Sequence, residues 1–364
     1  MNRRAFLRAT GGAGAVALAG CVTRESDEEE PEPEEGDEGE LRIATYSSFV
    51  DTEDAPGEWI REAFEEEYPD AELVWTTPEE RVNHYIQQEE QGVTIEADVY
   101  VGLNVDDLAR IDDQLGAGAL FGELDRGRLE HAHRVQTGLE MGDPSGRVIP
   151  YDTGYISLVY DENEVETPET FDDLIDSEYE STLLAQSAQT SDPGQAFLLW
   201  TIHEFGEEDY LGYWSDLVAN DVRILGDWSS SYEAYTNEER PMVVSYSTDQ
   251  VFASAEGADM SRHQVAFLND QGYANPEGMA IFEDTTHPDL AYAFVDFMLS
   301  EEAQAEIAVR NVQFPAVSEE YVDLPDDFDQ YAHEPEEAVT MGYDDLRGNL
   351  EEWLDDWSRE VIEQ

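Results

Sequence analysis

The regular alternation of short apolar runs with helix-periodic segments constrains the fold of this chain more than any other feature of its sequence. Over residues 41–102 we expect three strands and two helices in alternation, at Leu41–Tyr46, Gly57–Tyr68, Leu73–Thr76, Asn83–Gln91 and Ala97–Gly102. Strands that alternate with helices form parallel sheets whose faces are covered by the crossover helices. The sequence therefore predicts an α/β fold.

The later part of the chain repeats this pattern in a second α/β unit from Phe171 to about His263. The elements expected there and beyond are a helix at Gln195–Phe205, a strand at Met242–Tyr246, a helix at Leu290–Leu299, a helix that Ser300 caps and that runs to Val309, and a long amphipathic helix at Pro335–Val361.

The β-rich run Val148–Tyr160 contains Pro150 and Gly154, which predicts a crossing between lobes rather than one continuous strand. About 320 residues beyond the N-terminal segment are more than one core usually organises, so two lobes are expected. We assign residues 41–151 and about 264–310 to the first lobe. Residues 152–263 and about 311–364 form the second.

The charge of the chain excludes several classes of function. There are 87 acidic and 18 basic side chains, a formal net charge of −69, and every basic residue is Arg. This charge repels nucleic acid, and the absence of Lys excludes Schiff-base lysines and lysine general bases. Since 40% of the residues are apolar, the chain can still fold, and its acidic excess indicates a halophilic source in which salt screens the self-repulsion.

The N-terminus has the pattern of an export signal. Arg3-Arg4 precedes the apolar stretch Ala9–Gly20, which is too short to span a bilayer that needs about 20 residues. Cys21 is the only cysteine and ends a lipoprotein cleavage pattern, although an ordinary signal with an incidental Cys is the alternative. We predict a twin-arginine signal at residues 1–20, then lipidation of Cys21 and a disordered acidic tether at residues 21–40. The folded protein would be anchored to the outer face of the cytoplasmic membrane.

Familiar catalytic motifs are missing from the sequence, including nucleophile elbows, zinc-protease helices, phosphate loops and calcium loops. His131 and His133 lack further ligands nearby, so we interpret them as a solvated pair and predict no metal and no cofactor. Among 87 carboxylates, paired acids arise by chance and carry no information. The sequence therefore favours a binding protein over an enzyme.

Polar and aromatic residues at the ends of elements are better candidates for a binding site. Tyr46 ends the first strand, at the edge that faces the ligand crevice in open α/β sheets. Ser191 precedes a helix, where it could act as a cap or contribute to an anion site. Trp228 is expected in a polar loop with little core to join, which favours ligand stacking. Tyr246 ends an apolar strand, and Phe252 follows in the next turn.

Several blocks of sequence in a fixed order resemble one family. They are residues 44–49 (ATYSSF), 97–103 (ADVYVGL), 150–155 (PYDTGY), 159–161 (VYD), 190–194 (TSDPG), 198–200 (LLW), 228–229 (WS), 245–248 (SYST), 314–315 (FP) and 353–357 (WLDDW). In this combination the chain, from about residue 41 to its end, is similar to the periplasmic thiamine-binding components of ABC importers. The resemblance implies a type II periplasmic-binding-protein fold, with a mixed sheet flanked by helices in each lobe.

The same resemblance implies that thiamine or its mono- or diphosphate binds between the lobes. The implied contacts are Tyr46, Trp228, Tyr246 and Phe252 for the rings, Glu80 (or Glu79) for the aminopyrimidine, and Ser191 with Gly194 for the hydroxyethyl or phosphate end. Thiamine is a flat aromatic cation, and each aromatic face contributes about 0.5–2 kcal/mol to binding such a cation.

The chain departs from the family pattern at three places. Glu80-Arg81 stands where relatives have Asp-Gly, Phe252 where they have Tyr, and Val312 where they have Trp before the Phe314-Pro315 pair. Loss of that Trp removes one ring contact. Arg81, if its side chain points inward, could supply a phosphate contact.

The resulting hypothesis is a monomeric capture protein that is not an enzyme and that passes its ligand to a membrane permease and ATPase. Alternatives are a receptor for a polyamine or for ferric iron, and a secreted hydrolase that uses two carboxylates. Ferric iron would favour clustered tyrosinates, commonly an adjacent Tyr-Tyr, and no such dipeptide occurs in the sequence.

Overall fold

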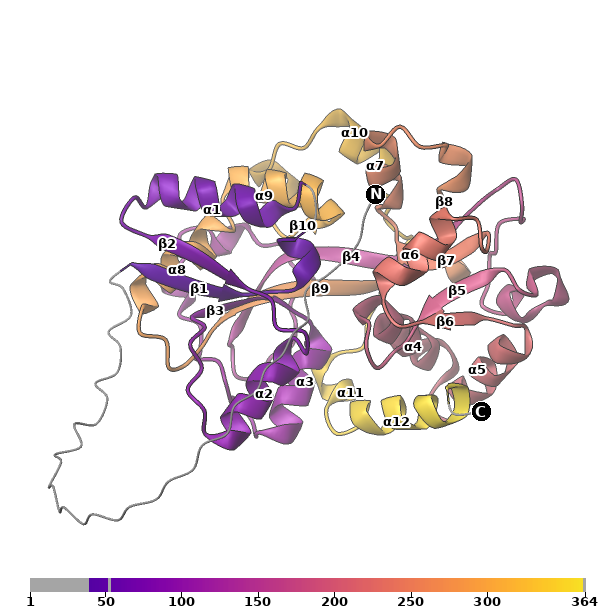
Figure 1. The fold of residues 1–364 in the computed structure, drawn as a ribbon, viewed down its shortest axis with the longest axis horizontal. Coiled ribbons are helices and arrows are strands. Elements are labelled where there is room, and N and C mark those ends of the chain that lie inside the picture. Colours follow the sequence, from indigo (N-terminus) through magenta and orange to yellow (C-terminus); the bar gives the residue numbers. More distant parts are fainter. Residues whose placement is uncertain (1–38, 52–53, 363–364) are drawn as a thin grey trace, which may run out of the picture. The chain divides into compact units, whose positions relative to one another are not determined.

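One mixed sheet of eleven strands organises the chain in the computed structural model, which describes residues 39–51 and 54–362 (Figure 1). The strands are β1 (Glu40–Ala44), β2 (Glu72–Thr76), β3 (Val99–Leu103), β4 (Val148–Tyr160), β5 (Leu183–Gln186), β6 (Arg223–Leu225), β7 (Met242–Tyr246), β8 (Gln264–Ala266), β9 (Gln271–Ile281), β10 (Phe314–Pro315) and β11 (Glu337–Val339). Their main order is β2-β1-β3-β9-β4-β7-β5-β6.

The sheet is parallel at both ends and antiparallel in the middle. β1 pairs in parallel with β2 and β3, and β5 with β6 and β7, whereas β9 and β4 run antiparallel to each other and to their other neighbours in that order. This confirms the predicted α/β class with a mixed sheet. The parallel ends follow from the strand–helix alternation, because parallel neighbours require crossover helices.

The expected interruption within Val148–Tyr160 is wrong, because β4 is one continuous strand of 13 residues. It pairs with β9 along its first part and with β7 and β8 along its last part. A register shift between Pro150 and Asp152 accommodates the proline, since a bulge relieves the pairing there. β4 and β9 therefore cross the middle of the sheet side by side (Figure 1).

The helices cover both faces of the sheet. They are α1 (Pro56–Glu67), α2 (Val82–Gln91), α3 (Val105–Gln114), α4 (Asp192–Phe205), α5 (Tyr210–Ala219), α6 (Trp228–Thr236), α7 (Asp249–Ala255), α8 (Pro288–Phe297), α9 (Glu301–Ile307), α10 (Asp326–Tyr331), α11 (Tyr343–Leu346) and α12 (Leu350–Val361). The predicted cap of α9 is confirmed, since Ser300 Oγ accepts a hydrogen bond of 3.2 Å from the Ala303 amide.

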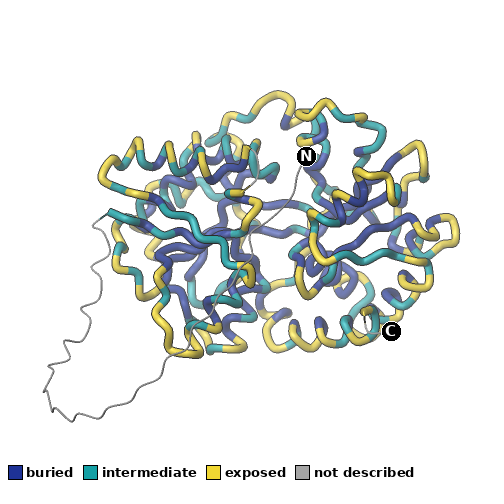
Figure 2. The backbone as a smooth tube through the Cα atoms, viewed as in Figure 1, coloured by how far each residue is buried: buried dark blue, intermediate teal, exposed yellow. Residues whose placement is uncertain are grey.

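The buried side chains form four clusters along the two halves of the sheet. Figure 2 shows the strands in the middle of the molecule mostly as buried residues and the outer turns of the helices as exposed ones. In the half that contains β1, one cluster includes Phe64 of α1 and another includes Tyr85 of α2. In the half that contains β5, a large cluster includes Trp200 and Trp214, and a small one includes Tyr235 of α6. Trp200 and Trp214 thus lie in the core of this half.

The single C-terminal helix expected over Pro335–Val361 is wrong. The segment instead contains β11, α11 and α12, and Gly348, between the two helices, has a left-handed φ of 80°. Side chains other than glycine rarely adopt this conformation, so Gly348 marks the break. Trp353 and Trp357 are nevertheless buried on α12, as an amphipathic helix requires.

Predictions for the N-terminus lie largely outside the described residues. The twin-arginine signal and Cys21 fall there, as does the acidic tether up to residue 38, whereas Glu40 already belongs to β1. Within residues 39–51 and 54–362, no helix combines the length and the apolar character that crossing a membrane requires.

Candidate functional site

Two buried carboxyl groups face each other at the centre of the sheet. Asp152 on β4 and Glu277 on β9 are cross-strand partners, with 0% and 7% of their surface exposed. Glu277 Oε2 accepts hydrogen bonds from Tyr46 Oη at 2.9 Å and from Tyr151 Oη at 2.5 Å. Asn311 Nδ2 donates to Asp152 Oδ2 at 2.8 Å and to Tyr46 Oη at 2.9 Å. We call these five residues the acid–phenol network.

Both acids resist ionisation. Burial, followed by the charge of Glu277, raises the pKa of Asp152 well above its ordinary value, and burial raises the pKa of Glu277. Within the described residues, neither carboxyl forms an ion pair, and Asp152 Oδ1 has no hydrogen-bond partner. A buried acceptor without a partner is costly, so this position favours a cationic or hydrogen-bond-donating ligand.

Arg81 brings a positive charge to the edge of the acid–phenol network. It precedes α2 with φ 53° and ψ −130°, a backbone conformation that glycine adopts far more readily. Its guanidinium forms an ion pair with Asp192 of α4 and donates to the Gly102 carbonyl oxygen at 3.3 Å. It lies 5.7 Å from the centroid of the Tyr46 ring. The side chain therefore points inward and links the two halves of the sheet.

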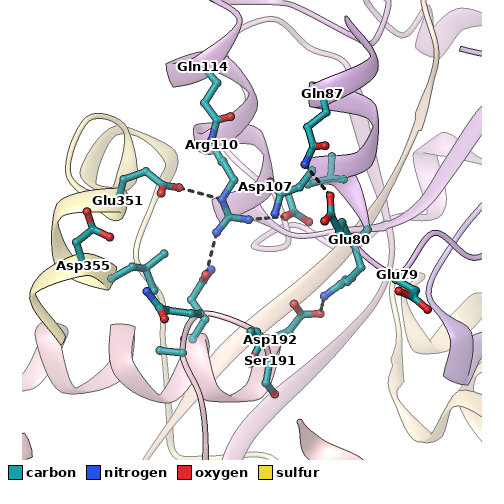
Figure 3. Close-up of a pocket in the computed structure, with 18 residues that line it drawn as sticks. Glu79, Glu80, Gln87, Asp107, Arg110, Gln114, Ser191, Asp192, Glu351 and Asp355 are labelled. Atoms are coloured by element: carbon teal, nitrogen blue, oxygen red, sulfur yellow. Dashed lines mark hydrogen bonds and ion pairs between the residues drawn. The ribbon is translucent and has the colours of Figure 1, made fainter. Parts of the chain in front are cut away.

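A cavity of about 540 Å³ lies beside this ion pair, between the loop at residues 79–83, α2, α3, the start of α4 and α12 (Figure 3). Six carboxyl groups and two guanidinium groups line it. Arg110 of α3 donates to Glu351 of α12 and to Gln195 of α4, both at 3.0 Å. Arg110 thus ties three helices together at the cavity wall.

The predicted polar contacts have different environments. Glu80 is exposed, lines the cavity and accepts a hydrogen bond from Gln87 at 2.6 Å. Ser191 caps α4 by position but not by a side-chain hydrogen bond, and its buried hydroxyl has no partner within the described part of the chain. A Cβ on Gly194 would lie 2.7 Å from the carbonyl oxygens of Gln186 and Ser187, so this glycine allows α4 to pack against the end of β5.

The predicted loop position of Trp228 is wrong, because Trp228 begins α6. Asp227 Oδ1 accepts from the Ser230 amide at 2.7 Å and so caps this helix. The half-buried Trp228 ring stacks on Tyr232 with centroids 4.8 Å apart, and its Nε1 donates to Ser245 Oγ at 3.1 Å. Phe252, 46% exposed, meets the same Tyr232 ring edge-on at 6.3 Å.

Tyr246 lies close to the acid–phenol network from the other half of the sheet. It ends β7, and burial, followed by the charges of Glu277 and Asp192, raises its pKa well above the ordinary value. A Cβ on Gly154 would lie 2.7 Å from the Tyr246 ring, so the glycine leaves room for that ring. The structure thus brings Tyr46 and Tyr246 to the same acids, whereas Trp228 and Phe252 meet at Tyr232.

Reasoning from sequence missed most of the acid–phenol network. Tyr151 and Asp152 lie in the PYDTGY block, which signalled the resemblance but was not given a binding role. Asn311 precedes Val312, the residue noted only as a departure from the family. Glu277 carried no signal, since it is one of 87 acids.

Comparisons with known proteins agree with this architecture. The profile of the family described as bacterial extracellular solute-binding protein matches residues 119–349. The thiamine-binding periplasmic protein of Escherichia coli (strain K12) is 26% identical over 322 residues, which cover 88% of this chain and 93% of that protein. The protein of the same name from Brucella suis biovar 1 is 26% identical over 321 residues, with 87% and 90% covered.

Solved structures show the same fold. A periplasmic thiamin binding protein superposes with a TM-score of 0.75 at 25% identity and covers 88% of this chain and 96% of its own. The ferric binding protein from Campylobacter jejuni has a TM-score of 0.71 at 16% identity, with 88% and 99% covered, and shows the fold alone. Because the family profile matches more than half of its residues, this chain belongs to the bacterial extracellular solute-binding protein family.

Proposed function

We propose that this protein captures thiamine in a cleft between two lobes and delivers it to the permease and ATPase of an ABC importer. The observation that carries the proposal is the buried acid–phenol network, in which two carboxyl groups that form no ion pair with any described residue lie beside aromatic rings. The support from relatives is that several proteins named for thiamine binding align along 87–88% of the chain.

The chemistry of the acid–phenol network suits a flat aromatic cation. Tyr46 and Tyr246 offer ring faces. A bound cation would favour the ionised forms of Glu277 and Asp152, whose raised pKa values reflect burial, and attraction to such a cation is strong in a buried setting. We propose that Glu277, rather than the exposed Glu80, is the acid that recognises the aminopyrimidine, because a buried acceptor discriminates more strongly than one already in water.

The cellular setting belongs to the same proposal. Residues 1–20 would direct export of the folded protein through the twin-arginine route, and lipidated Cys21 would anchor it outside the cytoplasmic membrane. The two lobes would have the boundaries given above and close over the ligand by a hinge motion. The protein would act as a monomer and catalyse no reaction.

Isothermal titration with thiamine in molar KCl tests the proposal. We expect saturation at one equivalent. Glu277→Gln, which keeps the size of the side chain but cannot ionise beside a bound cation, should weaken binding about 10- to 100-fold, the loss of one charged hydrogen bond. Glu301→Gln at the exposed start of α9 is the matched control and should leave the dissociation constant unchanged.

Parallel titrations with a polyamine and with ferric iron separate the alternatives within the family. Saturable binding of either, without binding of thiamine by a folded protein, would reject the proposed ligand. Turnover of a candidate substrate, abolished by one acid-to-amide change, would indicate the hydrolase instead.

A further inference from the structure

The first turn of α4 already holds an anion that belongs to the protein. Free amide groups at the start of a helix attract phosphate, which is why the sequence left an anion site open at this position. In the structure the first residue of α4 is Asp192, whose carboxylate lies at the cavity in an ion pair with Arg81. A phosphate placed here would be repelled by the Asp192 carboxylate, because both groups are negatively charged.

The nearest cation is already engaged. Besides its ion pair with Asp192, the Arg81 guanidinium donates to the Gly102 carbonyl oxygen. A phosphate that captured Arg81 would leave Asp192 uncompensated beside a second anion. Partial burial of both side chains, which are 26% and 31% exposed, limits how far salt can screen this repulsion.

The second cation on the cavity wall is engaged as well. Arg110 forms ion pairs with Glu351 at 3.0 Å and Asp107 at 3.4 Å, and it donates to Gln195 (Figure 3). Within the described residues that line the cavity, six carboxyl groups therefore stand against two guanidinium groups, both of which are paired. Along this described part of the wall, no unpaired guanidinium group remains to bind a phosphate.

An alcohol fits the same surroundings. A hydroxyl group can donate a hydrogen bond to a carboxylate such as Asp192. The hydroxyl of Ser191, which has no hydrogen-bond partner among the described residues, can donate or accept one. A phosphate ester at neutral pH lacks that donor and adds charge. Asp192 is therefore the residue that distinguishes a ligand that ends in an alcohol from the same ligand that ends in a phosphate ester.

We infer that Asp192, held by Arg81, makes this cleft selective for the unphosphorylated alcohol form of its ligand over phosphate esters. The inference rests on the proposed function. It departs from the expectation that Arg81 supplies a phosphate contact, because the structure places Arg81 in an ion pair with Asp192.

The test compares dissociation constants for thiamine, thiamine monophosphate and thiamine diphosphate on the same purified protein. The unmodified protein should bind thiamine at least about tenfold more tightly than either ester, the effect of about 1.4 kcal/mol. Asp192→Asn should reduce this ratio by about tenfold, because it removes the repulsion and frees Arg81. Glu301→Gln removes one carboxylate from the exposed start of α9, away from the cavity, and should leave the ratio unchanged.

Arg81→Gln in the Asp192→Asn background completes the test. If the freed guanidinium is what binds the ester, the double variant should lose the affinity for esters that the single variant gained. Equal or tighter binding of an ester by the unmodified protein would overturn the inference without any variant. An equal effect of Glu301→Gln would also overturn it. If none of the three compounds binds, the proposed function itself fails.

Discussion

Replacing Trp228 by Ala separates a role in ligand binding from a role in the fold. The substitution removes a stacked ring pair with Tyr232, worth about 0.5–1.5 kcal/mol, and a hydrogen bond to Ser245, worth about 0.5–1.5 kcal/mol. We therefore expect the free energy of unfolding to fall by about 1–3 kcal/mol. If Trp228 also contacts the cationic ligand, loss of that face costs about 0.5–2 kcal/mol, or about 2- to 30-fold in affinity.

Denaturant unfolding measures the first quantity, and calorimetric titration with thiamine measures the second. Trp59→Ala is the control, because this half-buried ring stacks on Phe297 of α8 with centroids 6.5 Å apart, within the core of α1 and α8. The control should lose stability and keep its affinity. An unchanged dissociation constant in Trp228→Ala would refute the ligand contact, and an equal loss of affinity in both variants would show that instability alone weakens binding.

Three further perturbations have outcomes that the structure specifies. Arg147→Met should lower the free energy of unfolding by about 3–5 kcal/mol in denaturant titrations, because it leaves the buried Asp112 without its bidentate partner. Gly194→Ala should destabilise by about 1–3 kcal/mol through its close contacts, whereas Gly212→Ala, which meets open space on α5, should stabilise slightly. Burial raises the folded-state pKa of Glu277, so this residue contributes stability in its protonated form at low pH, and that contribution is lost as pH rises through the folded-state pKa. Glu277→Gln should therefore make the free energy of unfolding, measured in denaturant at several pH values, depend less on pH.

Local patterns were sufficient to predict elements whose signals lie within a few residues. The helix expected at Gly57–Tyr68 is α1 at Pro56–Glu67, and the strand expected at Met242–Tyr246 is β7 with the same bounds. Trp228 was misplaced although a local signal existed, since Asp227 is a strong helix cap. Its surrounding serines suggested a loop, and the cap outweighed them.

The centre of the site could not be predicted because it depends on pairing over long distances in sequence. Asp152 and Glu277 meet only because β4 and β9 are antiparallel neighbours in one register, which no local pattern encodes. The role of Arg81 was equally hard to predict, because its ion-pair partner Asp192 lies on a helix that is distant in sequence. The family resemblance predicted the approximate location of the site, and the structure identified the buried acids Asp152 and Glu277 within it.

The continuity of β4 has a consequence for how this protein unfolds. Ile149 of β4 packs in the same core as α1, and Ile156 and Leu158 of the same strand pack in the core of α4. Unfolding either core would break backbone hydrogen bonds of β4 that also hold the other core in place. We therefore expect both cores to unfold in one cooperative transition. In hydrogen exchange, the amide protons that form the hydrogen bonds between β4 and β9 should therefore exchange with solvent last.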